Sequence, residues 1–100
     1  MNTFKEYKDQ IKTLCKTYRV KSLYVFGSIL TPNFNPESDI DLIVEFNDVP
    51  LEEYADNYFD FKFSLQDILN RPIDLLEEKA IKNPYFRKNI EHNKQLVYGQ

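Results

Sequence analysis

Apolar positions recur along the chain with two different periods. Near the N-terminus they follow one another at spacings of three and four, at Phe4, Tyr7, Ile11, Leu14 and Tyr18. That spacing is typical of one face of an α-helix. A second stripe of the same predicted helix is basic. It is either a solvated face or a docking surface for an acidic partner.

Two short apolar runs predict β-strands over residues 21–26 and 39–46. Gly27 ends the first strand. The segment from Thr31 to Ser38 is predicted to be a loop, because Thr31 precedes a proline and such a residue avoids the α-helical region of the backbone. The first half of the chain therefore predicts a helix followed by a strand, a loop and a second strand.

The second half predicts a long helix over residues 51–69, a strand over 72–76 and a final helix over 84–95. Helices and strands that alternate in this order are typical of an α/β domain. We expect residues 1–100 to form one domain, with a small mixed sheet of about three strands flanked by helices.

Two aromatic side chains of the long predicted helix, Phe59 and Phe63, fall beside its main apolar stripe. They either widen the face that packs on the core or form an exposed apolar patch. A chain of this length also has little material left to enclose a nucleotide and an acceptor, whereas a binding pocket normally buries most of its ligand. We therefore expect a hetero-oligomer with a helical partner.

The composition is that of an ordinary globular protein, with 42% hydrophobic and 15% aromatic residues. No apolar run approaches the roughly 20 residues of a membrane span, and none follows a basic N-terminus as in a signal peptide. The single cysteine, Cys15, cannot form an internal disulfide. We therefore expect a cytoplasmic protein without a membrane partner.

The net charge of −3 is unevenly distributed. Residues 1–21 carry six basic and two acidic groups, whereas residues 37–60 carry nine acidic groups and no basic one. An acidic centre does not attract a phosphate backbone by itself, so direct nucleic-acid binding is not expected. It suits a site in which cations lie between carboxylates and a phosphate.

Two carboxylates, Asp39 and Asp41, stand at the start of the second predicted strand. Because side chains alternate along a strand, both point to one face, while Ile40, Leu42 and Val44 point to the other. Anions this close repel each other, and burial further disfavours their ionised form. A divalent cation offsets both effects, and Mg²⁺ is typically held by one or two carboxylates together with substrate phosphates.

Two further features favour a site for a metal-bound nucleotide. Gly27 and Ser28 end the first strand, where a glycine allows a phosphate to approach the backbone and free N–H groups with a hydroxyl can bind it. Asp74 lies within the apolar strand 72–76, where an isolated charge is costly without a partner. It is the best candidate for a third metal ligand, because two-metal sites need further carboxylates.

The segment GSILTPNFNPESDID places ten residues between Ser28 and Asp39. It resembles the G-S-x10-D-x-D motif of the DNA-polymerase-β-like nucleotidyltransferase superfamily. The size of the chain, the strand context, the later acid in IDLL and the closing segment resemble its minimal nucleotidyltransferase (MNT) branch. Members of this branch are the antitoxin partners of HEPN toxins. The resemblance covers nearly the whole chain and implies the polymerase-β-like nucleotidyltransferase fold.

The resemblance also implies roles for the four residues of the motif and for Asp74. Gly27 and Ser28 would contact the phosphates of the donor. Asp39 and Asp41 would hold the metals, with two Mg²⁺ ions expected. Asp74 would complete the triad as a metal ligand and base. Family members often continue with R-A-R-G after Gly-Ser, whereas this chain has ILTP, so the extra phosphate contacts of those arginines are not expected.

The implied activity is the transfer of a nucleoside monophosphate, AMP from ATP, to a hydroxyl group. In this family the acceptor is a tyrosine of a HEPN toxin, so the chain would act as its antitoxin. One alternative is a catalytically inactive module that neutralises such a toxin by contact alone. Another is a small-molecule nucleotidyltransferase of the antibiotic-modifying kind. The second is disfavoured, because little chain follows Asp74 to build a substrate-binding helical domain.

Overall fold

The computed structural model describes residues 6–26 and 39–99. Its elements are α2 (Lys8–Thr17), β1 (Val20–Phe26), β2 (Ile40–Phe46), α3 (Leu51–Leu69), β3 (Ile73–Glu77), the 3₁₀ turn η2 (Glu78–Ala80), α4 (Pro84–Asn93) and β4 (Gln95–Tyr98). The three predicted helices and three predicted strands are thus confirmed in type and order. The loop predicted from Thr31 to Ser38 lies outside the described residues.

The strands form one mixed sheet in the order β3-β2-β1-β4. β1 is antiparallel to both β2 and β4, whereas β2 and β3 are parallel. This confirms the small mixed sheet, with one strand more than expected. The additional strand is β4, which is too short to show an alternating pattern in the sequence. Its pairing with β1 brings the C-terminal segment against the first strand.

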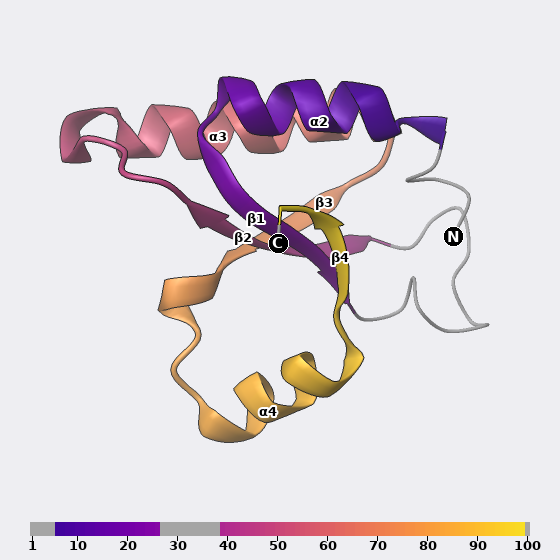
Figure 1. Cartoon of the computed structure of the whole chain (residues 1–100), viewed down its shortest axis with the longest axis vertical. Coiled ribbons are helices and arrows are strands. Elements are labelled where there is room, and N and C mark those ends of the chain that lie inside the picture. Colours follow the sequence, from indigo (N-terminus) through magenta and orange to yellow (C-terminus); the bar gives the residue numbers. More distant parts are fainter. Residues whose placement is uncertain (1–5, 27–38, 100) are drawn as a thin grey trace.

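The helices cover the two faces of the sheet unequally. α2 and α3 lie side by side on one face, and α4 lies on the other (Figure 1). The core is between the sheet and the α2–α3 layer. Its buried side chains are Ile11, Cys15, Val20, Leu23, Val25, Ile40, Leu42, Val44, Phe61, Leu65, Leu69, Ile73 and Leu75. In the described parts of the chain, no helix is long and apolar enough to cross a membrane.

Local capping sets the start of α4. The Asn83 side chain accepts hydrogen bonds from the backbone N–H groups of Tyr85 and Phe86, with N···O distances of 2.9 and 3.2 Å. A proline follows Asn83 at the first helical position, where its missing N–H costs no hydrogen bond. Arg87 then donates to the carboxylate and the carbonyl of Glu78, which ties α4 to η2.

Phe59 and Phe63 are exposed on α3, with 48% and 54% of their surface accessible. Their rings stack on each other, with centroids 6.0 Å apart and an interplanar angle of 26°. Of the two interpretations of these residues, the exposed apolar patch is therefore the correct one. Leu51, which its spacing from Tyr54 and Tyr58 predicts to lie on the core-facing stripe of this helix, is 89% exposed and lies outside the core.

Candidate active site

The alternation expected along β2 is confirmed. Ile40, Leu42 and Val44 are buried in the core against the helices, whereas Asp41 is half-buried on the opposite face. Asp39 lies immediately before the strand and is exposed. β2 therefore presents its acidic residues on the side of the sheet where α4 lies, at the end of the strand where the chain enters it.

Asp74 joins these two carboxylates through the register of the sheet. In the parallel pair of β2 and β3, Asp41 and Asp74 are Cα partners. Their neighbours in register are Leu42 and Leu75, which both point into the core, so Asp41 and Asp74 share the opposite face. Adjacent strands are about 4.8 Å apart, so the two carboxylates lie side by side. Asp74 is exposed rather than buried in its strand, so solvent lowers the cost of its charge.

The carboxylates affect one another electrostatically. The pKa of Asp41 is raised above its ordinary value, first by burial and then by the negative charges of Asp74 and Asp39. An ionised Asp41 is therefore unfavourable in this position. A cation bound between the three carboxylates would reverse that effect.

The donor set suits a hard divalent cation, because all three side chains offer only carboxylate oxygens. Within residues 6–26 and 39–99, however, no three histidine, cysteine or acidic side chains are gathered closely enough to hold a metal ion as they stand. The backbone brings the three carboxylates to one end of one face. To share a cation, the side chains would have to turn towards one another.

Gly27 and Ser28 lie outside the described residues, so their predicted role in phosphate binding stays a prediction. The strand that precedes them, β1, lies within the described residues. β1 and β2 are neighbours in the sheet, as a site shared by the two strand ends requires, and Phe26 is the Cα partner of Asp41. The chain therefore leaves β1 directly beside the carboxylates.

Two tyrosines of α3 hold the edge strand that carries Asp74. The Tyr58 hydroxyl donates to the Leu75 carbonyl at 2.5 Å, and the Tyr54 hydroxyl donates to the Glu77 carboxylate at 2.5 Å. The pKa of the Tyr58 hydroxyl is raised by burial and by the charges of Glu77 and Asp74. The helical spacing of the two tyrosines predicts that both face the core, but no local pattern in the sequence predicts a hydrogen bond to a later strand.

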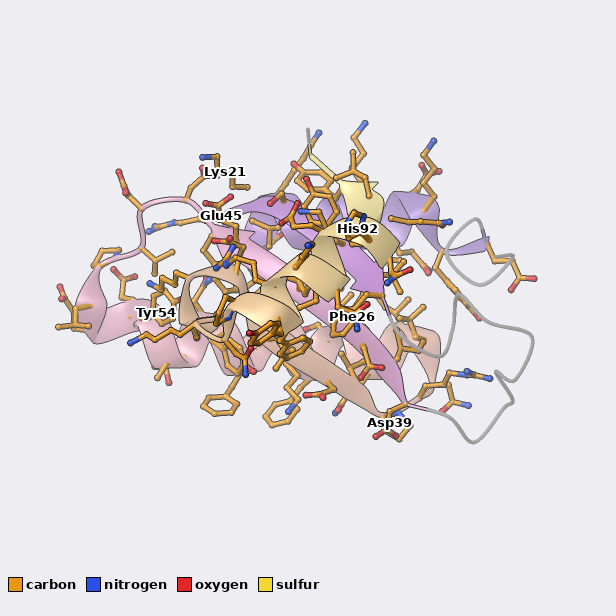
Figure 2. The ribbon with its side chains drawn as sticks, turned by 90° about the horizontal axis from the view of Figure 1, so that it is seen from below. Lys21, Phe26, Asp39, Glu45, Tyr54 and His92 are labelled. Carbon is orange, nitrogen blue, oxygen red and sulfur yellow. The ribbon has the colours of Figure 1, made fainter. Side chains whose placement is uncertain are left out.

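A cavity of about 460 Å³ lies on the same side of the sheet as the carboxylates, but at the other end. Figure 2 shows Lys21 and Glu45 at that end, far from Asp39. The side chains that line the cavity include Lys21, Ser22, Tyr24, Glu45, Glu78 and Lys94. This cavity is separate from the three acids, and the candidate active site is the one that the acids define.

Comparison with known families gives one match over most of the chain. Residues 7–97 match the family described as "Nucleotidyltransferase domain". This range contains the three acids and the Gly-Ser pair.

Relatives of similar length carry a consistent name. "Putative protein adenylyltransferase MJ0128" of Methanocaldococcus jannaschii is 39% identical, over 98% of this chain and 99% of the relative. "Putative protein adenylyltransferase MJ1379" of the same organism is 36% identical over the same shares of both chains.

Solved structures share the fold at low sequence identity. A structure described as that of a "putative minimal nucleotidyltransferase" has a TM-score of 0.77 and 21% identity, over 94% of this chain and 92% of the other. A toxin–antitoxin complex with AMP-PNP has a TM-score of 0.69 and 18% identity, over 93% of this chain and 73% of the other. A tri-AMPylated HEPN toxin of Shewanella oneidensis in complex with its MNT antitoxin has a TM-score of 0.65 and 16% identity, over 97% and 73%.

Proposed function

Because the chain belongs to the nucleotidyltransferase domain family, we propose that it is a magnesium-dependent enzyme that transfers AMP from ATP to a hydroxyl group. The observation that carries this proposal is the register between Asp41 and Asp74, with Asp39 two residues earlier on the chain. This register brings Asp41 and Asp74, with Asp39 just before β2, to one end of one face of the sheet. Phosphoryl transfer of this kind depends mainly on positioning and on compensation of negative charge.

Each carboxylate has a proposed role. Asp39 and Asp41 would hold two Mg²⁺ ions, and Asp74 would be a further ligand and the base that accepts the proton of the attacking hydroxyl. When bound, the metal ions would polarise the α-phosphate of ATP and compensate the charge of the departing pyrophosphate. Gly27 and Ser28 bind the phosphates of the donor. The electrostatic support for this arrangement is the raised pKa of Asp41, because burial and two nearby anions make that position favourable for a cation.

The acceptor that we propose is a tyrosine hydroxyl of a helical HEPN-type toxin. The support comes from relatives and structural neighbours. Relatives of nearly equal length are named as protein adenylyltransferases, and one neighbour contains a tri-AMPylated HEPN toxin with an MNT antitoxin. Modification of its partner would make this chain an antitoxin. The buried, unpaired thiol of Cys15 suits the reducing cytoplasm where such a pair would act.

An exposed apolar surface on α3 supports the proposal of a protein partner. Phe59 and Phe63 form a stacked, exposed apolar pair, and such patches on small domains often mark protein interfaces. We propose that a helix of the HEPN partner covers this pair. The exposed lysines of α2 offer a second, electrostatic contact that would steer association.

The test is transfer of label from ATP radiolabelled at the α-phosphate. The chain and its purified HEPN partner are incubated with labelled ATP and Mg²⁺, and the partner is then separated and counted. We expect label on a partner tyrosine, loss of labelling with a chelator, and loss with Asp39→Asn together with Asp41→Asn. A matched control is Asp67→Asn, an exposed acid on α3 that should leave labelling unchanged.

The same experiment separates the alternatives. A complex that forms and neutralises the partner without label would favour a module that acts by contact alone. In a parallel incubation to which a small hydroxylated antibiotic is added, label on the antibiotic and none on a protein would favour a small-molecule nucleotidyltransferase. Either result would contradict the proposed protein adenylylation.

A further inference from the structure

A pair of accessible aromatic rings lies beside the three carboxylates. Phe26 is the last residue of β1 and the Cα partner of Asp41 across the antiparallel β1–β2 pair. Residues directly opposite one another in such a pair have their side chains on the same face. The Phe26 ring therefore lies next to Asp41, on the side of the sheet that α4 covers (Figure 2).

Phe86 of α4 supplies the second ring. The two ring centroids are 6.2 Å apart, and the rings are inclined by 57°. Phe86 is 41% exposed and Phe26 is partly exposed, so neither ring is fully covered by the fold. The Asn83 cap fixes the first turn of α4 and thereby the position of Phe86. Aromatic faces held at a fixed angle beside a charged site are suited to a flat ligand.

The position of these rings in the sheet indicates which reactant they would meet. In the strand order β3-β2-β1, Asp74, Asp41 and Phe26 form a row across the sheet. If Asp74 accepts the proton of the attacking hydroxyl, the acceptor approaches from the β3 side. The nucleoside of the donor then has room on the β1 side of Asp41, where Phe26 and Phe86 lie.

We propose that Phe26 and Phe86 form a stacking platform for the base of the donor nucleotide. This inference rests on the proposed nucleotidyl transfer and adds how the donor is selected. Every base has a π-face, so stacking on aromatic rings tolerates changes in hydrogen-bonding groups. The platform therefore selects nucleotides by the area of the ring system of their base. ATP and GTP should bind with similar affinity, and both should bind more tightly than CTP.

The test is calorimetric titration of the full chain with ATP, CTP or tripolyphosphate, each with Mg²⁺. Tripolyphosphate has no base and reports on the phosphate and metal contacts alone. Loss of one stacking ring typically weakens base binding by about tenfold. We expect Phe86→Ala to weaken ATP binding by about that factor, CTP binding by less, and tripolyphosphate binding not at all.

Three further variants distinguish stacking from other effects. Phe86→Trp keeps a flat ring and should retain or increase ATP affinity, whereas Phe86→Leu keeps an apolar side chain without a ring and should behave like Phe86→Ala. Tyr85→Ala is the matched control, because Tyr85 is the preceding residue of α4 and is 84% exposed. It should change no affinity. Thermal melts of each variant confirm that the fold is kept.

Two results would overturn the platform. One is unchanged ATP affinity in Phe86→Ala, and the other is an equal loss for ATP and tripolyphosphate, which would indicate a general disturbance of the site. These outcomes differ from failure of the proposed function. If the wild-type chain and its complex bind no ATP with Mg²⁺, the nucleotidyl transfer itself is contradicted. If the wild-type chain binds ATP and the Phe86→Ala variant binds it equally well, only the platform is contradicted.

Discussion

Asp41 on β2 and Asp74 on β3 are Cα partners in a parallel strand pair, so two carboxylates far apart in the sequence lie side by side. The relationship depends on the crossover through α3, because parallel neighbours cannot be joined by a tight turn. The core explains why this register is kept. Slipping β3 by one residue would move Ile73 and Leu75 out of the core and turn Asp74 into it.

The first prediction concerns Asp39, just before β2, and Asp41 within it. Asp39→Asn with Asp41→Asn should abolish magnesium-dependent ATP binding, measured by calorimetry, and leave the fold intact. In the folded chain the pKa of Asp41 is raised, so ionisation of this group destabilises the fold relative to the unfolded chain. That penalty is present above the raised pKa. It disappears as the pH falls below the ordinary pKa of aspartate, where the group is protonated in both the folded and the unfolded chain.

The double variant should therefore melt at the same temperature as the wild type or higher at pH 7 without metal, and the difference should shrink near pH 3. The control is Asp67→Asn, which removes one exposed acid from α3. Wild-type affinity for ATP with Mg²⁺ in the double variant would contradict a metal role for these residues.

The second prediction is that Asp74 serves chemistry more than binding. Asp74→Ala should lower the rate of transfer by several orders of magnitude and change ATP affinity much less, because its interactions are made mainly in the transition state. Glu77→Gln is the control. Glu77 accepts a hydrogen bond from Tyr54 of α3 and so belongs to the other face of the sheet. Near-wild-type transfer by Asp74→Ala in a single-turnover assay would assign the base to another residue.

The sequence predicts the scaffold of this site better than its surroundings. Asp39 and Asp41 are recognisable because alternation along one strand is a local pattern. Their meeting with Asp74 depends on the strand order. The family resemblance implies that Asp74 joins them, but no local pattern in the sequence fixes that order. The contact between Phe26 and Phe86 joins the last residue of β1 to the first turn of α4 on one face of the sheet. Such a contact depends on how a helix docks, and no spacing of residues encodes it.

The third prediction concerns the hydrogen bond that holds β3 at the edge of the sheet. Tyr58→Phe removes the donor to the Leu75 carbonyl and leaves that partly buried acceptor without it. The free energy of unfolding should fall by about 1 kcal/mol, measured by urea denaturation. Tyr85→Phe, at a position that is 84% exposed, removes the same atom from the surface and should have no measurable effect. Equal stability of both variants would show that the Tyr58 hydroxyl makes no net contribution to the free energy of unfolding.

The fourth prediction uses the buried thiol. Cys15 has no exposed surface, and burial raises the pKa of its thiol to about 12. Since the thiolate is the reactive form, the folded chain should resist alkylation by iodoacetamide at pH 8.5, while the chain in urea reacts readily. Stability should also fall as the pH rises above about 9, because the unfolded chain then loses a proton that the folded chain keeps. Rapid alkylation under native conditions would contradict this account of Cys15.

The last prediction concerns the exposed pair on α3. Phe59→Asp with Phe63→Asp should abolish the complex with a helical HEPN-type partner, measured by analytical ultracentrifugation, and preserve the circular dichroism spectrum of the chain. The reason is that both rings stand out of the core, so two charges there remain solvated in the free chain but would be buried without a counter-charge in the complex. The matched control places the same two charges at the same i, i+4 spacing on α4, by Asn89→Asp with Asn93→Asp, at exposed positions on the opposite side of the sheet. Loss of the folded spectrum in the phenylalanine variant would show that these rings support the core after all, and loss of the complex in the control variant would show that added charge alone, rather than this surface, disrupts the interaction.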